Sequence, residues 1–213
     1  MLLGISLDKQ IIIGIAGNIG VGKTTMTEKL SKSLNFNPIY ESVIDNPYLE
    51  DFYDNMPRWS FNLQVYFLYH RFQSQIDLIK TGKNFIQDRT IYEDREIFAK
   101  NLYDSGSMKG RDWETYKQLY SSMIHFVSEP NLIVYLKANT DTLMSRINNR
   151  NRDFEKDISS EYIYSLNIYY DRWINSLDQK KVMIIDTNAF NIFKDIDKLE
   201  SIINSIKERV EQK

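Results

Sequence analysis

A short apolar run that ends in a glycine-rich loop constrains the fold of this chain most. Residues 10–16 read QIIIGIA, the continuous β-branched pattern of a strand buried on both faces. Residues 17–24 read GNIGVGKT and fit the pattern GxxxxGK(S/T). Beyond them Met26, Leu30 and Leu34 recur at four-residue spacing, which predicts an amphipathic helix. Strand, glycine loop and helix in this order are the context that the motif requires.

The glycine loop predicts a binding site for a nucleoside triphosphate. Glycines let the backbone wrap around phosphates with its N–H groups pointing inward, and the helix N-terminus adds positive potential. We expect Lys23 to reach the β- and γ-phosphates and the Thr24 hydroxyl to ligate Mg²⁺. ATP and Mg²⁺ are therefore the expected cofactors, and the ATP site comprises Gly17, Asn18, Ile19, Gly20, Val21, Gly22, Lys23, Thr24 and Thr25. A glycine-rich turn without a ligand is the alternative interpretation.

Four further short segments have the pattern of strands and alternate with helical patterns. They are residues 38–41, 84–88, 132–136 and 181–186. Helical periodicity covers residues 23–34, 58–79, 90–103, 112–127, 140–149, 159–177 and 192–210. Asp112 is a candidate N-cap. In the second helix we expect a buried apolar face of Phe61, Val65, Leu68, Phe72 and Ile76.

This alternation predicts an α/β fold. Parallel strands need crossover helices between them, so the expected architecture is a five-stranded parallel sheet flanked by helices. The length of 213 residues and the apolar fraction of 42% suit one domain over residues 1–213.

Composition argues against several classes of partner. The formal net charge is −2, so no global basic field exists to hold polymeric nucleic acid or an anionic membrane. No apolar run approaches the roughly 18 to 20 residues of a membrane-spanning helix. Asp8 and Lys9 interrupt the N-terminal apolar stretch, unlike in a signal peptide. The chain has no cysteine, which is compatible with a reducing compartment, and we expect a soluble protein in the cytoplasm.

Three classes of enzyme use such a loop. A GTPase would carry an NKxD segment and a DxxG segment, and neither string occurs in the chain. A motor ATPase usually ends an apolar run in an acidic residue, whereas residues 132–136 are followed by Lys137. A small-molecule kinase fits better.

Carboxylates follow two of the predicted strands. Glu41 comes at the end of the second strand, and Asp88 with Arg89 ends the third. Ligands of parallel sheets bind at the carboxyl ends of the strands, so these side chains are expected at one edge beside the glycine loop. Glu41 could take a proton from an attacking hydroxyl, Asp88 could hold Mg²⁺ or its waters, and Arg89 could bind the acceptor oxygen. Taken singly, each acid is as well explained as a solvated strand end.

Three arginines follow the fourth strand. Arg146 and Arg150 lie four residues apart on one helical face, and Arg152 leads into the loop after it. Together these cations could close over a transferring phosphoryl group. A solvated basic face beside neighbouring acidic residues is the alternative.

These residues together resemble the deoxyribonucleoside kinase family, and within it the bacterial deoxyadenosine/deoxyguanosine kinase branch. The resemblance covers nearly the whole chain. It comprises the glycine loop, Glu41-Ser42-Val43, Asn46-Pro47-Tyr48-Leu49 through Tyr53, Arg58-Trp59 with Asn62-Leu63-Gln64, Asp88-Arg89-Thr90, Phe98, and residues 146–152. One departure is Ser42, where the family commonly has proline; its loss could loosen the segment that carries Glu41.

The resemblance implies a role for most of these positions. It implies that Glu41 is the general base on the 5′-hydroxyl, that Arg89 keeps it ionised, and that Asp88 lies near the metal. Arg146, Arg150 and Arg152 become the cations of an arginine-rich lid at about residues 146–157, in the fold of a P-loop kinase. The residues implied to hold the sugar and the base are Tyr53 and Glu155 on the 3′-hydroxyl, Gln64 on the base edge, Phe98 stacked on the base, and the charged pair Arg71 and Asp94 over it. For Phe98, ordinary core packing is the alternative.

The charged pair also bears on the substrate. By resemblance it marks kinases of purine or cytosine deoxynucleosides, so deoxyadenosine is favoured, deoxyguanosine and deoxycytidine are possible, and thymidine is disfavoured. The resemblance also implies a homodimer formed through helices beside the sheet. Two alternatives stay open: a nucleoside monophosphate kinase similar to thymidylate kinase, and a non-catalytic ATP-binding module. In the first, Glu41 would repel the acceptor phosphate.

Overall fold

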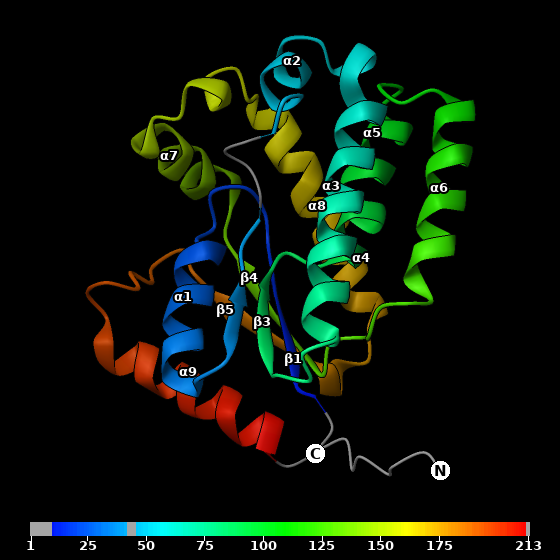
Figure 1. The fold of residues 1–213 in the computed structure, drawn as a ribbon. Helices are drawn as coiled ribbons and strands as arrows, with labels where there is room; N and C mark the ends of the chain where they lie inside the picture. The colour runs from blue at the N-terminus through cyan, green and yellow to red at the C-terminus, as the bar shows by residue number, and fades with distance from the viewer. Residues whose placement is uncertain (1–9, 42–45, 212–213) are drawn as a thin grey trace, which may run out of the picture.

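At the centre of the molecule lies a five-stranded, wholly parallel sheet with the strand order β2-β3-β1-β4-β5 (Figure 1). A computed structural model describes residues 10–41 and 46–211 of the chain. The strands are β1 (Ile12–Ala16), β2 (Asn37–Ile39), β3 (Phe85–Asp88), β4 (Leu132–Lys137) and β5 (Val182–Asp186). This confirms the predicted fold class and its five strands.

The central strand is β1. Its β-branched side chains are at most 1% exposed because helices cover both faces of the sheet. Burying an isoleucine contributes on the order of 1.5–3 kcal/mol, so this strand is a natural centre for the fold. In the register, Ile15 lies beside Asp88 and Ala16 beside Tyr135. The glycine loop therefore leaves the sheet between the carboxyl ends of β3 and β4.

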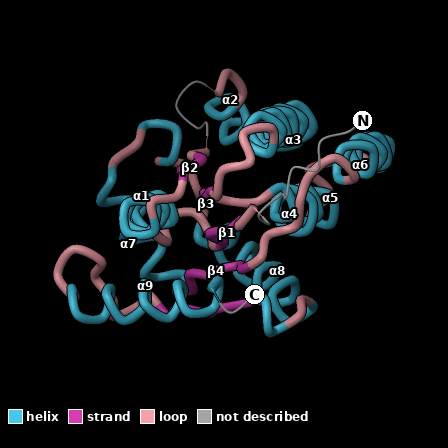
Figure 2. The backbone as a smooth tube through the Cα atoms, turned by 60° about the horizontal axis from the view of Figure 1, so that its bottom comes forward, coloured by secondary structure: helices cyan, strands magenta, loops and turns pink. Residues whose placement is uncertain are grey.

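Helices cover the two faces (Figures 1 and 2). On one side lie α1 (Lys23–Leu34), α7 (Thr140–Arg150) and α9 (Ile196–Glu211), which share a core with the strands. On the other lie α3 (Met56–Ile79), α4 (Ile91–Glu93), α5 (Lys100–Asp104), α6 (Gly110–Ile124) and α8 (Ser160–Ser176). Shorter elements are α2 (Leu49–Asp54), the 3₁₀ turns η2 (Asp153–Glu155) and η3 (Gln179–Lys181), and the π-helical η1 (Asp94–Ala99). Within the described residues no helix is both long and apolar enough to cross a bilayer.

Several predicted boundaries were wrong. The second strand ends at Ile39, so Glu41 lies on the segment that follows it. Helix α6 begins at Gly110 with Lys109 as its N-cap, and Asp112 lies in the first turn, where a carboxylate complements the helix dipole. The last helix begins at Ile196 rather than at residue 192, because Asp195 accepts a bond from the backbone N–H of Asn191 at 2.7 Å and closes a turn there.

Helix α2 and the 3₁₀ turns η2 and η3 escaped the sequence prediction. Helix α2 is too short to show a helical period, and its only local signal is the acidic pair in its first turn. The π-helical η1 lies within the helix predicted over residues 90–103, but its π geometry was not predicted; it carries Asp94 and Phe98. Such π segments occur often at functional sites.

The buried face of α3 is also not the apolar one that was expected. Apart from Leu63 and Leu68, its fully buried side chains are polar: Ser60, Gln64, Arg71 and Gln75. The expected positions Phe61, Val65 and Phe72 are only partly buried, against the core formed with α5 and α6. Helix α3 thus buries a polar stripe, from which Arg71 reaches the carbonyl oxygens of Asp88 and Arg89 at the end of β3.

Candidate active site

The glycine loop joins β1 to α1 at the centre of the sheet edge. Gly17 has a φ of 148°, and a Cβ atom there would lie 2.6 Å from the carbonyl oxygen of Leu136. Gly20 has a φ of 83°, and its Cβ would lie 2.9 Å from the Ile147 side chain. Only glycine meets both the conformation and the lack of space at these positions. The unpaired N–H groups of the first turn of α1 follow directly and form a site for anions.

Lys23 lies folded into this loop. Its Nζ donates to the carbonyl oxygen of Asn18 at 3.1 Å, and the side chain is buried. Burial, and then the cation of Arg89, lower the pKa of Lys23 to about 8, against the opposing carboxylates of Asp88 and Glu41. Burial and the neighbouring Arg89 cation thus outweigh the carboxylates that lie near the ammonium group.

Thr24 and Asp88 meet between the loop and β3. The Thr24 hydroxyl donates to Asp88 Oδ2 at 2.5 Å, and Asp88 is 1% exposed. Asp88 Oδ1 is buried and has no hydrogen-bond partner among the described residues. Burial raises the pKa of Asp88, and the nearby cations of Lys23 and Arg89 offset this effect only in part. A divalent cation with oxygen ligands fits this donor set, since Mg²⁺ takes one or two protein oxygens and completes its shell with phosphates and water.

Glu41 is held by two guanidinium groups. Arg89 Nη1 and Arg71 Nη2 each lie 3.1 Å from its Oε1. Burial alone would raise the pKa of this carboxyl, but Arg89 and Arg71 outweigh it and lower the pKa to about 2. Glu41 is therefore an ionised carboxylate at neutral pH. The departure at Ser42, like Val43, lies outside the described residues.

Arg89 is fixed at both its backbone and its side chain. Its φ is 67°, a left-handed value that costs energy for a residue other than glycine. The backbone N–H donates to the carbonyl oxygen of Ile15 at 3.0 Å, and its own carbonyl accepts from Arg71 Nη1 at 3.1 Å. The guanidinium lies 4.2 Å from the centre of the Phe98 ring. These contacts maintain the unusual backbone conformation that aims Arg89 at Glu41.

The residues expected to read the base lie next to this pair. Arg71 Nε donates to Asp94 Oδ2 at 2.7 Å, and both side chains are almost wholly buried. Gln64 is 2% exposed, and its Oε1 has no partner among the described residues. Phe98 is 6% exposed and packs against side chains of α8. The guanidinium of Arg89 covers one face of its ring. The buried amide oxygen and the ion pair thus converge from α3 and η1.

Tyr53 and Glu155 lie on the lid side of this group. Burial raises the pKa of Tyr53, with further contributions from Tyr162 and Glu155. Glu155 is 5% exposed and accepts two bonds from Arg150, with Arg150 Nε at 2.5 Å from Oε2. Arg152 Nη1 lies 3.7 Å from the same carboxylate. Two of the three lid arginines therefore gather around Glu155.

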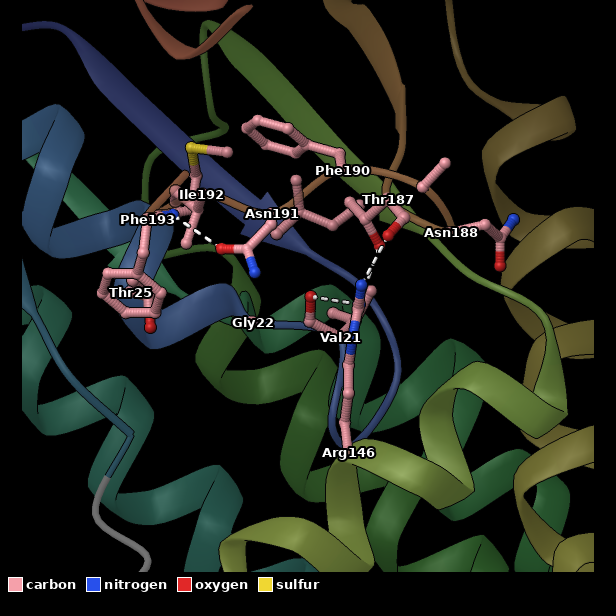
Figure 3. A pocket seen from close by; sticks show the side chains of 13 residues that line it. Val21, Gly22, Thr25, Arg146, Thr187, Asn188, Phe190, Asn191, Ile192 and Phe193 are labelled. Carbon is pink, nitrogen blue, oxygen red and sulfur yellow. Dashed lines mark hydrogen bonds between the residues drawn. The ribbon is translucent and has the colours of Figure 1, made fainter. Parts of the chain in front are cut away.

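The third lid arginine lies elsewhere. Arg146 Nη1 donates to the carbonyl oxygen of Val21 at 3.3 Å and to the Thr187 hydroxyl at 3.1 Å, and Nη2 donates to the Thr187 carbonyl (Figure 3). It lines a cavity of about 510 Å³ between the glycine loop and residues 187–193. The expected grouping of three cations is thus divided between two places in this structure.

The cavity wall formed by residues 187–193 was not anticipated from the sequence. Its polar part comes from Thr187, Asn188 and Asn191, and its aromatic part from Phe190 and Phe193. A signal was present, because this segment leaves β5 at the same edge of the sheet as the glycine loop.

Comparisons with known proteins agree with this geometry. A family model for deoxynucleoside kinases matches residues 13–211. The deoxyadenosine/deoxycytidine kinase of Bacillus subtilis strain 168 is 37% identical over 202 residues, which cover 94% of this chain and 93% of that protein. The deoxyadenosine kinase of Dictyostelium discoideum is 40% identical over 193 residues, which cover 91% of this chain and 78% of that protein.

A solved structure shows the same fold. Deoxyadenosine kinase from M. mycoides with bound dATP matches with a TM-score of 0.80 at 30% identity, covering 93% of this chain and 100% of that chain. The match to the family model over residues 13–211 and the identity to these relatives show that the chain belongs to the deoxynucleoside kinase family.

Proposed function

We propose that this protein transfers the γ-phosphoryl group of ATP to the 5′-hydroxyl of a deoxynucleoside, with deoxyadenosine the favoured acceptor, for nucleotide salvage. The observation that carries the proposal is the carboxylate of Glu41, held ionised by Arg71 and Arg89 at the edge of the sheet where the glycine loop lies. An alcohol must lose its proton to attack phosphorus, and a fixed carboxylate within hydrogen-bond reach can accept it.

Positioning and charge do the remainder of the chemistry. The glycine loop and Lys23 hold the triphosphate, with Lys23 exchanging the Asn18 carbonyl for phosphate oxygens. Arg89 orients Glu41 and lies beside the acceptor oxygen. Arg150 and Arg152 neutralise charge that develops on the transferring group. The hydrogen bonds of Arg150 and the ion pair of Arg152 with Glu155 would keep both cations near the site before ATP arrives.

Thr24 and Asp88 would hold Mg²⁺. The unpaired Asp88 Oδ1 and the Thr24 hydroxyl supply the oxygen ligands, and bound Mg²⁺ would supply positive charge to the phosphate oxygens. A bound cation would also offset the burial that now raises the pKa of Asp88.

The acceptor pocket favours a base with a hydrogen-bonding edge. Gln64 offers an amide that can pair bidentately with adenine, and the Arg71–Asp94 pair offers a further donor and acceptor. Phe98 would stack on the base, and Tyr53 with Glu155 would bind the 3′-hydroxyl. The names of the relatives, which are deoxyadenosine, deoxycytidine and deoxyguanosine kinases, support this range of bases.

The cavity beside Arg146 suits the base of the donor nucleotide. It adjoins Gly22 and Thr25, so a triphosphate in the loop would direct its nucleoside there. The guanidinium of Arg146 and the ring of Phe193 present flat surfaces to a base, and flat cationic and aromatic groups stack well on bases. On this proposal Arg146 binds the donor base, while Arg150 and Arg152 serve the phosphoryl group.

We further propose a homodimer in the cytoplasm. Helix α3 presents an aromatic outer face that includes Tyr69, which is 51% exposed. Aromatic side chains are enriched in subunit interfaces, which agrees with a dimer formed through helices beside the sheet.

A coupled assay of ATP consumption tests the function. Deoxyadenosine, deoxyguanosine, deoxycytidine and thymidine serve as acceptors, and deoxyadenosine monophosphate is the matched alternative acceptor. We expect turnover with deoxyadenosine and little with thymidine or the monophosphate. Turnover with the monophosphate alone would instead identify a monophosphate kinase, and ATP consumption without regard to acceptor would reject both.

A further inference from the structure

The backbone N–H and the backbone carbonyl of Gly17 are each hydrogen-bonded to a side chain from a distant segment. The Gly17 N–H donates to Glu93 Oε1 at 3.3 Å, and the Gly17 carbonyl accepts from the Tyr170 hydroxyl at 2.8 Å. All three groups are buried. Gly17 is the first residue of the phosphate-binding loop, so these two bonds fix how the loop leaves β1.

Glu93 also holds the acceptor side of the site. Its second oxygen, Oε2, accepts from the backbone N–H of Thr90 at 2.7 Å and from the Thr90 hydroxyl at 3.1 Å. Thr90 directly follows Arg89, whose left-handed backbone aims the guanidinium at Glu41. One buried carboxyl group therefore joins the donor loop to the turn that carries the acceptor machinery.

The hydrogens in this cluster can be counted. Tyr170 Oη lies 2.8 Å from Glu93 Oε1 and also 2.8 Å from the Gly17 carbonyl oxygen. A phenol has one hydrogen and cannot donate to both acceptors. If Glu93 carries a proton on Oε1, it donates to Tyr170, and Tyr170 donates to Gly17, so that both short contacts become hydrogen bonds. If Glu93 is ionised, one of the two contacts places lone pairs against each other.

Burial supports the protonated form. It raises the pKa of Glu93, although the nearby cations of Arg89 and Lys23 and the bonds from Thr90 and Tyr170 act in the other direction. The same part of the site already contains the carboxylates of Glu41, Asp88 and Asp94 beside the cations of Lys23, Arg71 and Arg89. An ionised Glu93 would add a fourth carboxylate to this cluster, which has three cations.

We infer that Glu93 with its proton, together with Tyr170, is a positioning pair that keeps the Gly17 peptide and the Arg89–Thr90 turn in register for phosphoryl transfer. Neither side chain touches the reacting atoms. In-line transfer depends on close alignment of the acceptor oxygen with the γ-phosphorus, and a displacement of about 1 Å can cost on the order of 10²-fold in rate. A pair that ties the donor loop to the acceptor turn acts on that alignment.

Removal of one hydroxyl tests the pair. Tyr135→Phe is the matched control, because Tyr135 is also buried, stacks on Tyr170 at 5.7 Å between ring centres, and donates its hydroxyl hydrogen to Asp171 at 3.4 Å rather than to Gly17. We expect Tyr170→Phe to lower the single-turnover transfer rate by about tenfold or more per bound ATP, with the KM for deoxyadenosine changed less than about threefold. Tyr135→Phe should keep the wild-type rate. Equal rates in the two variants would overturn the positioning role.

Substitutions of Glu93 test the proton. A glutamine at this position can donate to Tyr170 and accept from Thr90, as the protonated acid does, and loses only the long contact from Gly17. The transfer rate of Glu93→Gln should therefore be at least about fivefold higher than that of Glu93→Ala. Infrared difference spectra between the wild type and Glu93→Gln should show the carbonyl band of a protonated carboxylic acid. A carboxylate band in its place, or equal damage in the two variants, would contradict the inference.

Discussion

Arg89 donates to Glu41 at 3.1 Å from a backbone held at a φ of 67°. The conformation is unfavourable for arginine, and Arg71 stabilises it by bonding the Arg89 carbonyl while it also bonds Glu41. Arg71 thus stabilises the strained backbone of Arg89, and Arg71 and Arg89 together stabilise the negative charge of Glu41. The carboxyl group of Glu41 therefore stays ionised at neutral pH, because its pKa lies far below 7.

This arrangement predicts the effect of Glu41→Gln. The amide keeps the shape and can still accept from Arg89, but it cannot take a proton, so kcat should fall by about 10² or more, the scale of general-base loss. ATP binds at the other side of the site and should keep its affinity within a factor of about three. Steady-state kinetics with an ATP-binding titration measures both. Glu50→Gln, on the exposed side of α2, is the control; wild-type turnover in the Glu41 variant would remove the base assignment.

The same carboxylate predicts how stability depends on pH. Its folded-state pKa, about 2, lies below the ordinary value of 4.5, so its stabilising contribution is present above about pH 4.5 and is lost as the pH falls toward 2. Urea unfolding from pH 7 to pH 3 should therefore show a smaller loss of stability in Glu41→Gln than in the wild type. Parallel losses in the two proteins would show that Arg71 and Arg89 do not hold the carboxylate as proposed.

Lys23 predicts an alkaline limb in the kinetics. Its pKa in the nucleotide-free protein is about 8, so it is charged below that pH and neutral above it. The kcat/KM for ATP reports the free enzyme and should fall by up to about tenfold per pH unit above pH 8. Bound phosphates favour the charged lysine, so the limb in kcat should lie at higher pH. Limbs that coincide, or a kcat/KM that is flat to pH 10, would contradict this.

Mg²⁺ dependence should follow the ligand oxygens. Thr24→Val removes the hydroxyl that faces Asp88 but keeps the side-chain volume, whereas Thr24→Ser keeps the hydroxyl. At fixed ATP, we expect half-maximal activity at about tenfold higher Mg²⁺ in the valine variant, since a lost ligand worth about 1.4 kcal/mol changes affinity tenfold. The serine variant should stay near the wild type. The same Mg²⁺ midpoint in all three proteins would exclude Thr24 as a ligand.

Local patterns in the sequence were sufficient for the strands and the glycine loop. Strand β1 and the loop are specified by residues 12–22, and their burial and φ angles follow from that composition. The meeting of Glu41 with Arg89 also followed from the rule that strand ends converge at one edge of a sheet. The strand, the glycine loop and this contact depend on residues close in the chain or on the pairing of parallel strands. The periodicity of the sequence indicates both.

Contacts across the core could not be predicted in this way. Tyr170 reaches Glu93 from 77 residues away, and Arg146 reaches Thr187 from 41 residues away. The polar stripe of α3 was missed for a related reason: hydrophobic periodicity assumes that buried faces are apolar, and α3 instead buries Gln64, Arg71 and Gln75. Burial of a polar side chain depends on partners that lie on other elements.

The ion pair of Arg71 and Asp94 predicts linked losses of specificity and stability. In Asp94→Asn, Arg71 keeps its bonds to Glu41 and to the backbone carbonyls of Asp88 and Arg89 but loses its nearest charged partner, at 2.7 Å. Breaking a buried pair typically costs about 3–5 kcal/mol, and the remaining amide acceptor places the expected cost at the lower end, about 3 kcal/mol. The kcat/KM for deoxyadenosine should fall by at least about tenfold relative to that for thymidine, because the pocket loses a charged contact to the purine.

Asp171→Asn is the matched control for this prediction. Asp171 pairs with Lys137 at 2.8 Å, but both side chains are close to half exposed. Exposed pairs contribute about 0–1 kcal/mol, so this variant should unfold at nearly the wild-type urea concentration and keep its base preference. Urea unfolding and kinetics with both acceptors decide the outcome. If Asp94→Asn were as stable as the control and equally selective, the pair would have no part in reading the base, and specificity would rest on Gln64 and the shape of the pocket.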